Sequence, residues 1–151
     1  MKLSQNFSLR ELTKSQTAER KGIPNEPQEE HVENLKLLCT NILQPIRNEF
    51  GTVSISSGYR SPDLCVALGS KSTSQHACGQ AADFECYGID NNKLFNWAVE
   101  NLTFDQAILE FYDGDPNSGW IHMSYNEDNN RGQKLRAYRE NNKVIYQPVD
   151  I

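Results

Sequence analysis

The strongest constraint on the fold comes from two short segments, residues 74–83 and 119–122, which lie far apart in the sequence. They hold two of the three histidines in the 151-residue chain, each beside small or apolar residues typical of a buried cleft. Two imidazoles and one carboxylate can hold Zn²⁺ and leave a fourth position for water, the arrangement of a catalytic zinc. We therefore predict a site with the ligands His76, Asp83 and His122, and the fold has to bring these three together.

The spacing of one histidine and one aspartate is weak evidence by itself, because a histidine in an apolar segment is usually a hydrogen-bonded core residue. The joint pattern is more informative. Residues 74–83 read Ser-x-His-x-x-Gly-x-Ala-x-Asp, and Trp-x-His follows about forty residues later. The third histidine, His31, lies among acidic residues at the start of a predicted helix, so we expect it to be exposed and exclude it as a ligand.

These motifs, together with Ser-Gly-Tyr-Arg-Ser-Pro at residues 57–62, resemble the zinc peptidases of peptidoglycan. These are the D-alanyl-D-alanine carboxypeptidases and the L-alanyl-D-glutamate endopeptidases. Residues 7–12, 17–18 and 44–47 are similar to the short, single-domain members found in bacteriophages. The resemblance implies an α+β fold of the hedgehog/DD-peptidase type, with an antiparallel-rich sheet flanked by helices. It also implies Zn²⁺ as the cofactor, peptidoglycan peptides as the partners, and hydrolysis of peptide bonds in the stem peptides.

The reaction needs a carboxylate that takes a proton from the attacking water and passes it to the leaving amine. Several relatives carry this acid three positions before the last histidine, where the present chain has Gly119. The resemblance to phage-type sequences favours Glu110. If the strands pair antiparallel, Glu110 shares a face with His122 only when it lies opposite an even-numbered residue. The other open candidates are Asp113, Asp115 and Glu85.

The resemblance also assigns a role to Arg60, which would face the zinc and bind a carbonyl or carboxylate of the substrate. A guanidinium suits this task because its fork matches the geometry of an oxyanion. The alternative is a salt bridge at the surface. We predict that Ser74 hydrogen-bonds the substrate or orients its loop. Further candidates for substrate binding, with plain packing as the alternative, are Tyr59, Gln75 and Trp120.

A chain of this length is expected to form one domain, residues 1–151, with residues 1–26 as an N-terminal packing arm. The net charge of −5 gives no electrostatic reason for a nucleic-acid partner. No run approaches the roughly 18 apolar residues of a membrane span, and the N-terminus lacks an apolar signal segment. We therefore expect a monomer that is made in the cytoplasm and acts on the cell wall after lysis or assisted release, as a phage endolysin does.

Hydrophobic periodicity and turn residues predict the secondary structure. We expect Pro45 to bend or end the longest helix. A closing hairpin is predicted over residues 135–147, around Asn141 and Asn142. The four cysteines lack any Cys-x-x-Cys spacing, so we expect reduced thiols. Helices are predicted over residues 7–12, 15–21, 28–46, 62–68 and 90–101, and strands over residues 52–57, 81–86, 104–111 and 120–125.

A rival prediction comes from a different class of function. The same scaffold can keep its zinc without catalysis, as in hedgehog-type signalling domains. A non-catalytic cell-wall-binding or virion structural module is therefore the alternative. A carboxylate beside an open zinc position would favour the enzyme.

Overall fold

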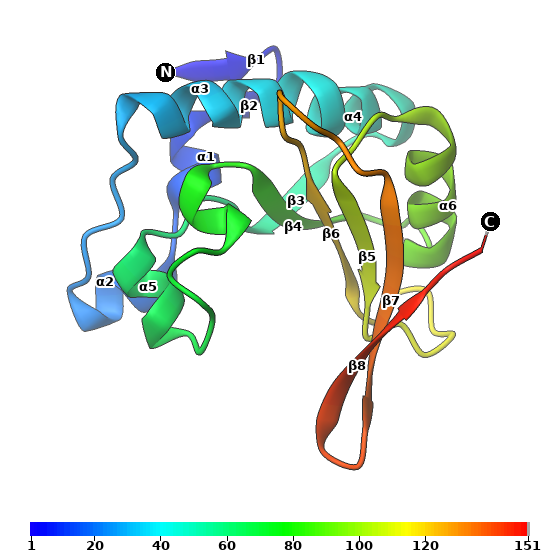
Figure 1. The fold of residues 1–151 in the computed structure, drawn as a ribbon. Helices are drawn as coiled ribbons and strands as arrows, with labels where there is room; N and C mark the ends of the chain where they lie inside the picture. The colour runs from blue at the N-terminus through cyan, green and yellow to red at the C-terminus, as the bar shows by residue number, and fades with distance from the viewer. Residues whose placement is uncertain (151) are drawn as a thin grey trace.

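A six-stranded sheet forms the centre of the computed structural model, which describes residues 1–150 (Figure 1). All neighbouring strands in the sheet pair antiparallel except β5 and β7, which pair parallel. The predicted antiparallel-rich α+β fold is therefore confirmed. The strands, in the order of the sheet, are β3 (Val53–Ser57), β4 (Ala81–Cys86), β6 (Trp120–Ser124), β5 (Gln106–Glu110), β7 (Gln133–Glu140) and β8 (Lys143–Pro148).

One face of the sheet is covered by helices and forms the main core. The helices are α3 (Glu29–Leu38), a π turn (Cys39–Leu43), α4 (Gln44–Phe50) and α6 (Asn91–Asn101). Because side chains alternate along a strand, every second residue of β4, β5 and β6 points to this face and its neighbours point to the other. The buried core residues on these three strands are Ala82, Phe84, Ala107, Leu109, Ile121 and Met123.

The helix does not end at Pro45, one of the two outcomes predicted there, because it continues through this residue to Phe50. A proline ring in a regular helix clashes with the carbonyl group four residues earlier. Here the residues just before the proline form a π turn, in which the Gln44 N–H bonds to the Cys39 carbonyl five residues back. This wider turn accommodates the ring without breaking the helix.

The N-terminal segment differs from the prediction of a helix over residues 7–12. Strand β1 (Lys2–Ser4) pairs with β2 (Phe7–Ser8), and α1 (Leu9–Thr13) starts only after the Ser8 cap. The second predicted helix is confirmed as α2 (Gln16–Lys21). Leu3, Phe7 and Leu12 belong to the main core, so this segment packs against the rest of the chain.

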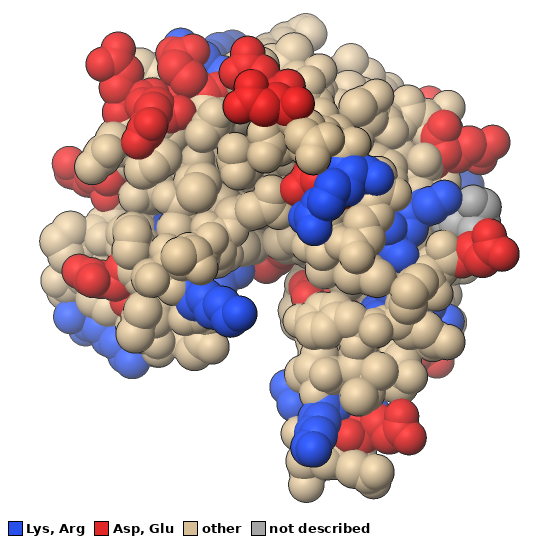
Figure 2. All heavy atoms as spheres, viewed as in Figure 1, with Lys and Arg blue, Asp and Glu red and all other residues tan. Residues whose placement is uncertain are grey.

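The predicted closing hairpin is confirmed and is longer than expected. Its turn residues Asn141 and Asn142 both have positive φ angles, of 53° and 64°. Two left-handed residues in a row suit the right-handed twist of a two-residue hairpin. The β7–β8 hairpin extends beyond the rest of the sheet, across a hollow from α2 and α5 (Pro62–Ala67) (Figures 1 and 2).

Two further sequence predictions concern the membrane and the thiols. None of the helices within residues 1–150 has the length and apolar character that a membrane crossing requires. The four cysteines are free thiols, as the sequence predicts.

Candidate metal centre

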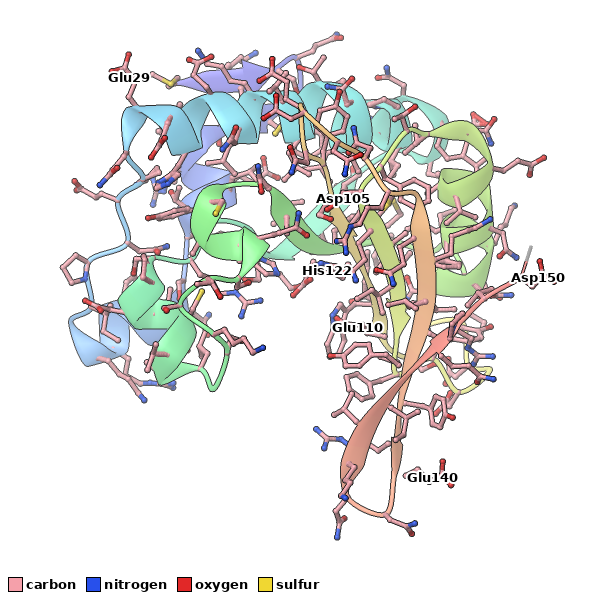
Figure 3. All side chains as sticks on the ribbon, in the orientation of Figure 1. Glu29, Asp105, Glu110, His122, Glu140 and Asp150 are labelled. Atoms are coloured by element: carbon pink, nitrogen blue, oxygen red, sulfur yellow. The ribbon has the colours of Figure 1, made fainter. Side chains whose placement is uncertain are left out.

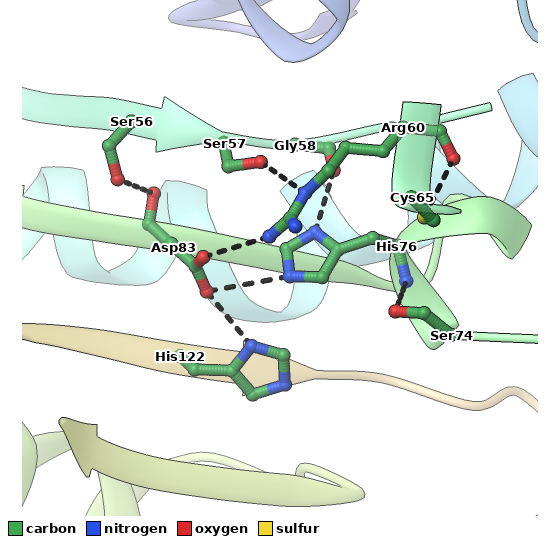
Figure 4. A network of polar contacts seen from close by, with 9 residues as sticks. All are labelled: Ser56, Ser57, Gly58, Arg60, Cys65, Ser74, His76, Asp83 and His122. Atoms are coloured by element: carbon green, nitrogen blue, oxygen red, sulfur yellow. Dashed lines mark hydrogen bonds and ion pairs between the residues drawn. The ribbon is translucent and has the colours of Figure 1, made fainter. Parts of the chain in front are cut away.

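The structure brings the three predicted ligands together on the face of the sheet opposite the main core (Figure 4). Asp83 on β4 lies directly opposite His122 on β6, so the two side chains share that face. His76 comes from a short 3₁₀ helix (Gln75–Cys78) that precedes β4. The Asp83 Oδ1 atom lies 2.9 Å from His122 Nδ1 and 3.5 Å from His76 Nε2.

Backbone groups fix the orientation of the His76 ring. Its Nδ1 donates to the Gly58 carbonyl at 2.7 Å, which turns the Nε2 atom towards Asp83. Gly58 can lie here because it has no side chain: a Cβ atom at this position would be only 2.4 Å from the Leu12 carbonyl oxygen. The Ser74 hydroxyl accepts from the His76 N–H at 3.2 Å and caps the 3₁₀ helix.

Asp83 is nearly fully buried and is ionised in this environment. Burial by itself would raise its pKa, but hydrogen bonds and charge from His122 and His76 outweigh that effect and hold the pKa well below its ordinary range. A carboxylate only accepts hydrogen bonds, so the Nδ1 of His122 carries the proton in its contact with Asp83. A divalent cation would replace that proton.

The cluster fits zinc by donor type and by spacing. Zn–N and Zn–O bonds of about 2.0–2.1 Å in a tetrahedral site place neighbouring ligand atoms roughly 3.3 Å apart. Two of the spacings are 3.5 and 2.9 Å, and the three ligand atoms all lie within 4.8 Å of one another. Within residues 1–150, no other group of three or more histidine, cysteine or acidic side chains is gathered in this way. Three protein donors leave the fourth zinc position to water or substrate.

Arg60 holds the second oxygen of the Asp83 carboxylate. Its Nη2 lies 3.2 Å from Asp83 Oδ2, and its Nε donates to the Ser57 hydroxyl at 2.7 Å. The Arg60 side chain is 14% exposed, so this is an internal ion pair and not the surface salt bridge that was the alternative. Partners of this kind orient the ligand that they contact. The role of Arg60 in substrate binding stays a prediction.

Glu110 meets the geometric condition set by the sequence. It lies opposite Trp120, an even-numbered residue, and therefore on the same face as His122 (Figure 3). Burial, and then the charge of Asp83, raise the pKa of Glu110 above its usual value. The buried Trp120 indole N–H makes no hydrogen bond of ordinary geometry. It lies close enough to the Glu110 carboxylate to offset part of the rise in its pKa.

Gly119 explains why the acid is not three positions before the last histidine. This residue has a φ of 66°, and a Cβ atom there would lie 2.0 Å from the Glu110 carbonyl oxygen. No side chain fits without moving the backbone. The carboxylate reaches the site from the neighbouring strand instead, because Glu110 pairs with the residue that follows Gly119.

The cluster opens into a cleft of about 470 Å³. Of the four general-base candidates, Glu110 alone is among the described residues that line it. Three of the predicted substrate-binding residues also line it: Ser74, Gln75 and Trp120.

Tyr59, the fourth of them, is buried and does not line the cleft. Its ring stacks on His31, with centroids 5.7 Å apart. The predicted exposure of His31 is therefore wrong, since this stacking leaves its side chain only 18% exposed.

A comparison with protein families decides where this fold and site belong. The family model of peptidase M15 matches residues 5–124. The chain belongs to the peptidase M15 family. The match covers all three predicted ligands, Arg60 and Glu110, and it supports a zinc metallopeptidase. No curated protein matches the chain closely enough to be counted as a relative.

Sequence reasoning missed one support of this M15 site, the buried Asp105. Its carboxylate accepts from the Gln75 amide at 2.8 Å and from the Arg131 guanidinium at 2.8 and 3.0 Å. The hydrogen bonds from Arg131 hold the pKa of Asp105 below its usual value. Asp105 thus ties the segment that carries His76 to the central sheet. The only local sequence signal for this role of Asp105 was its position directly before strand β5.

Proposed function

We propose that this M15 peptidase hydrolyses peptide bonds in the stem peptides of peptidoglycan, as a phage endolysin-type or wall-modifying enzyme. The observation that carries the proposal is the cluster of His76, Asp83 and His122 beside a carboxylate, Glu110, on the same face of one sheet. A zinc site with an adjacent carboxylate and an open cleft is an arrangement suited to metal-assisted peptide hydrolysis.

The protein groups have distinct tasks in this reaction. His76, Asp83 and His122 would hold the zinc, which would supply a water of lowered pKa, about 7, and polarisation of a carbonyl group. Glu110 takes the proton of the attacking water and gives it to the leaving amine. Arg60 keeps Asp83 in place while the charge at the site changes.

The position of Glu110 supports an enzyme over a non-catalytic module. A half-buried carboxylate with a raised pKa costs stability, and a module that only binds the wall has no use for it at this point of the cleft. As part of the same proposal, the protein reaches the wall after lysis or with the help of a partner protein.

Purified peptidoglycan provides the test. Zinc-loaded protein is incubated with it, and the soluble products are analysed by mass spectrometry. We expect new amino or carboxyl termini within the peptide stems and intact glycan bonds, and we expect a chelator to abolish the release. Protein that holds one zinc per chain and releases nothing would contradict the proposal and favour the binding module. The masses also tell D-Ala-D-Ala cleavage from L-Ala-D-Glu cleavage.

A further inference from the structure

The β7–β8 hairpin forms one wall of the metal cleft, although it lies beyond residues 5–124, where the M15 match ends. It contributes Leu135 and Tyr146 to the lining of the cleft. Ser70, Ser74 and Gln75 line the cleft from other elements. Figure 2 shows the hollow that separates the hairpin from the lobe formed by α2 and α5.

The register of the sheet places Tyr146 in line with the predicted general base. Glu110 lies opposite Ala137 on β7, and Ala137 lies opposite Tyr146 on β8. Directly opposite residues share a face, so all three side chains lie on the cleft side of the sheet, and Glu110 and Tyr146 line the cleft. Strands lie about 4.8 Å apart, which puts Glu110 and Tyr146 roughly 10 Å apart at their backbones. Ala137, which lies between them, is itself buried.

The floor beside this space is apolar. Ile108, Leu135 and Ala137 form a separate buried cluster on the cleft face. Tyr146 lies on the same face of the sheet as this floor, and it is 54% exposed. An exposed aromatic ring that lines a cleft beside an apolar surface, and that carries a polar hydroxyl, is typical of a residue that contacts a ligand.

Electrostatics agree with this placement. The pKa of Tyr146 is raised by burial of its phenol and by the negative charges of Glu110 and Asp83. The phenol therefore keeps its proton near neutral pH, where it is a hydrogen-bond donor at the edge of the site.

We propose that Tyr146 binds the substrate, with its O–H donating to a backbone carbonyl of the peptide and its ring covering a small side chain on the floor of Ile108 and Leu135. This inference rests on the proposed function, because it takes the occupant of the cleft to be a peptide. In this proposal the β7–β8 hairpin, which lies outside the residues matched by the M15 model, provides a substrate contact through Tyr146.

The test uses the synthetic pentapeptide L-Ala-D-Glu-L-Lys-D-Ala-D-Ala, which contains both candidate bonds. Steady-state kinetics are measured for the zinc-loaded wild type, Tyr146→Phe and Tyr146→Leu. The matched control is Tyr138→Phe, since Tyr138 lies on the same hairpin opposite Ile145 and points to the other face. Zinc content and thermal denaturation show that each variant is folded and loaded.

We expect Tyr146→Phe to raise KM about three- to tenfold, the loss of one hydrogen bond, and Tyr146→Leu to raise it further, about tenfold or more, because the ring is lost too. The kcat values should stay within about threefold, and Tyr138→Phe should match the wild type. Equal KM values for both Tyr146 variants and the control would overturn the role of Tyr146 alone. A wild type that cleaves neither bond would remove the proposed function together with this inference.

Discussion

Replacing Glu110 by glutamine tests the assignment of the general base. The change keeps the size of the side chain and removes its ability to accept a proton. General acid–base catalysis contributes about 10²- to 10⁴-fold in rate. We expect a loss in the upper part of this range, because no other carboxylate in the cleft is free to replace Glu110 as the base. The one other carboxylate that lines the cleft, Asp83, is already held by His122 and Arg60. We expect kcat to fall about 10³-fold or more, about 4 kcal/mol in activation free energy.

The assay is the release of peptide fragments from purified peptidoglycan, measured with zinc content on the same samples. The variant should still bind one zinc per chain and show a KM within about threefold of the wild type, since Glu110 is not among the clustered ligands. Asp113→Asn is the matched control. It removes the charge of a rival candidate, and its amide oxygen can still accept from the Asp115 N–H. Undiminished cleavage by Glu110→Gln would remove Glu110 from the mechanism.

Three further predictions concern stability and metal binding. In the metal-free protein, Glu110→Gln should be more stable than the wild type at pH 7. The folded state raises the pKa of this carboxyl group, so wild-type stability falls as the pH rises above the unfolded value of about 4.3. Denaturant titrations should show the advantage disappearing below about pH 4. Gly119→Ala should lower the free energy of unfolding by about 3 kcal/mol, because alanine is strained at a left-handed φ and its Cβ overlaps the backbone of Glu110. The control Gly132→Ala has the same φ of 66° but open space around the added Cβ, so its free energy of unfolding should fall by about 1 kcal/mol. Equal losses would show that the overlap has no effect. Arg60→Lys should weaken zinc binding about 10- to 100-fold, because lysine cannot contact Asp83 and Ser57 at the same time, as the guanidinium does. Competition with a chelating dye measures the affinity, and an unchanged value would show that Arg60 does not support the ligand Asp83.

The strands and helices with strong local patterns could be predicted from the sequence. The strand over residues 81–86 has the predicted bounds, and the paired asparagines mark the hairpin turn. The β1–β2 pair was missed because strands of three and two residues carry no periodicity and exist only through their pairing. The π turn before Pro45 has no local signal that separates it from an α-helix.

The residues of the candidate site also divide into those with a local sequence signal and those without one. A motif of fixed spacing identified His76, Asp83 and His122 because each lies on a short element whose backbone orients it. The register that aligns Glu110 with His122 could be stated only as a condition, since it depends on how distant strands pair. Tyr146 was missed because it reaches the site through the parallel pairing of β5 with β7, which joins segments outside the motif.

Metal analysis of the purified protein tests the central claim most directly. The protein is stripped with a chelator, titrated with zinc, and analysed for stoichiometry and for the coordinating atoms by X-ray absorption. We predict one zinc per chain, with two imidazole nitrogens and carboxylate or water oxygens as ligands and no sulfur, and loss of tight binding in His76→Ala and His122→Ala. A folded protein that takes up no zinc, or that binds it through sulfur, would contradict the account.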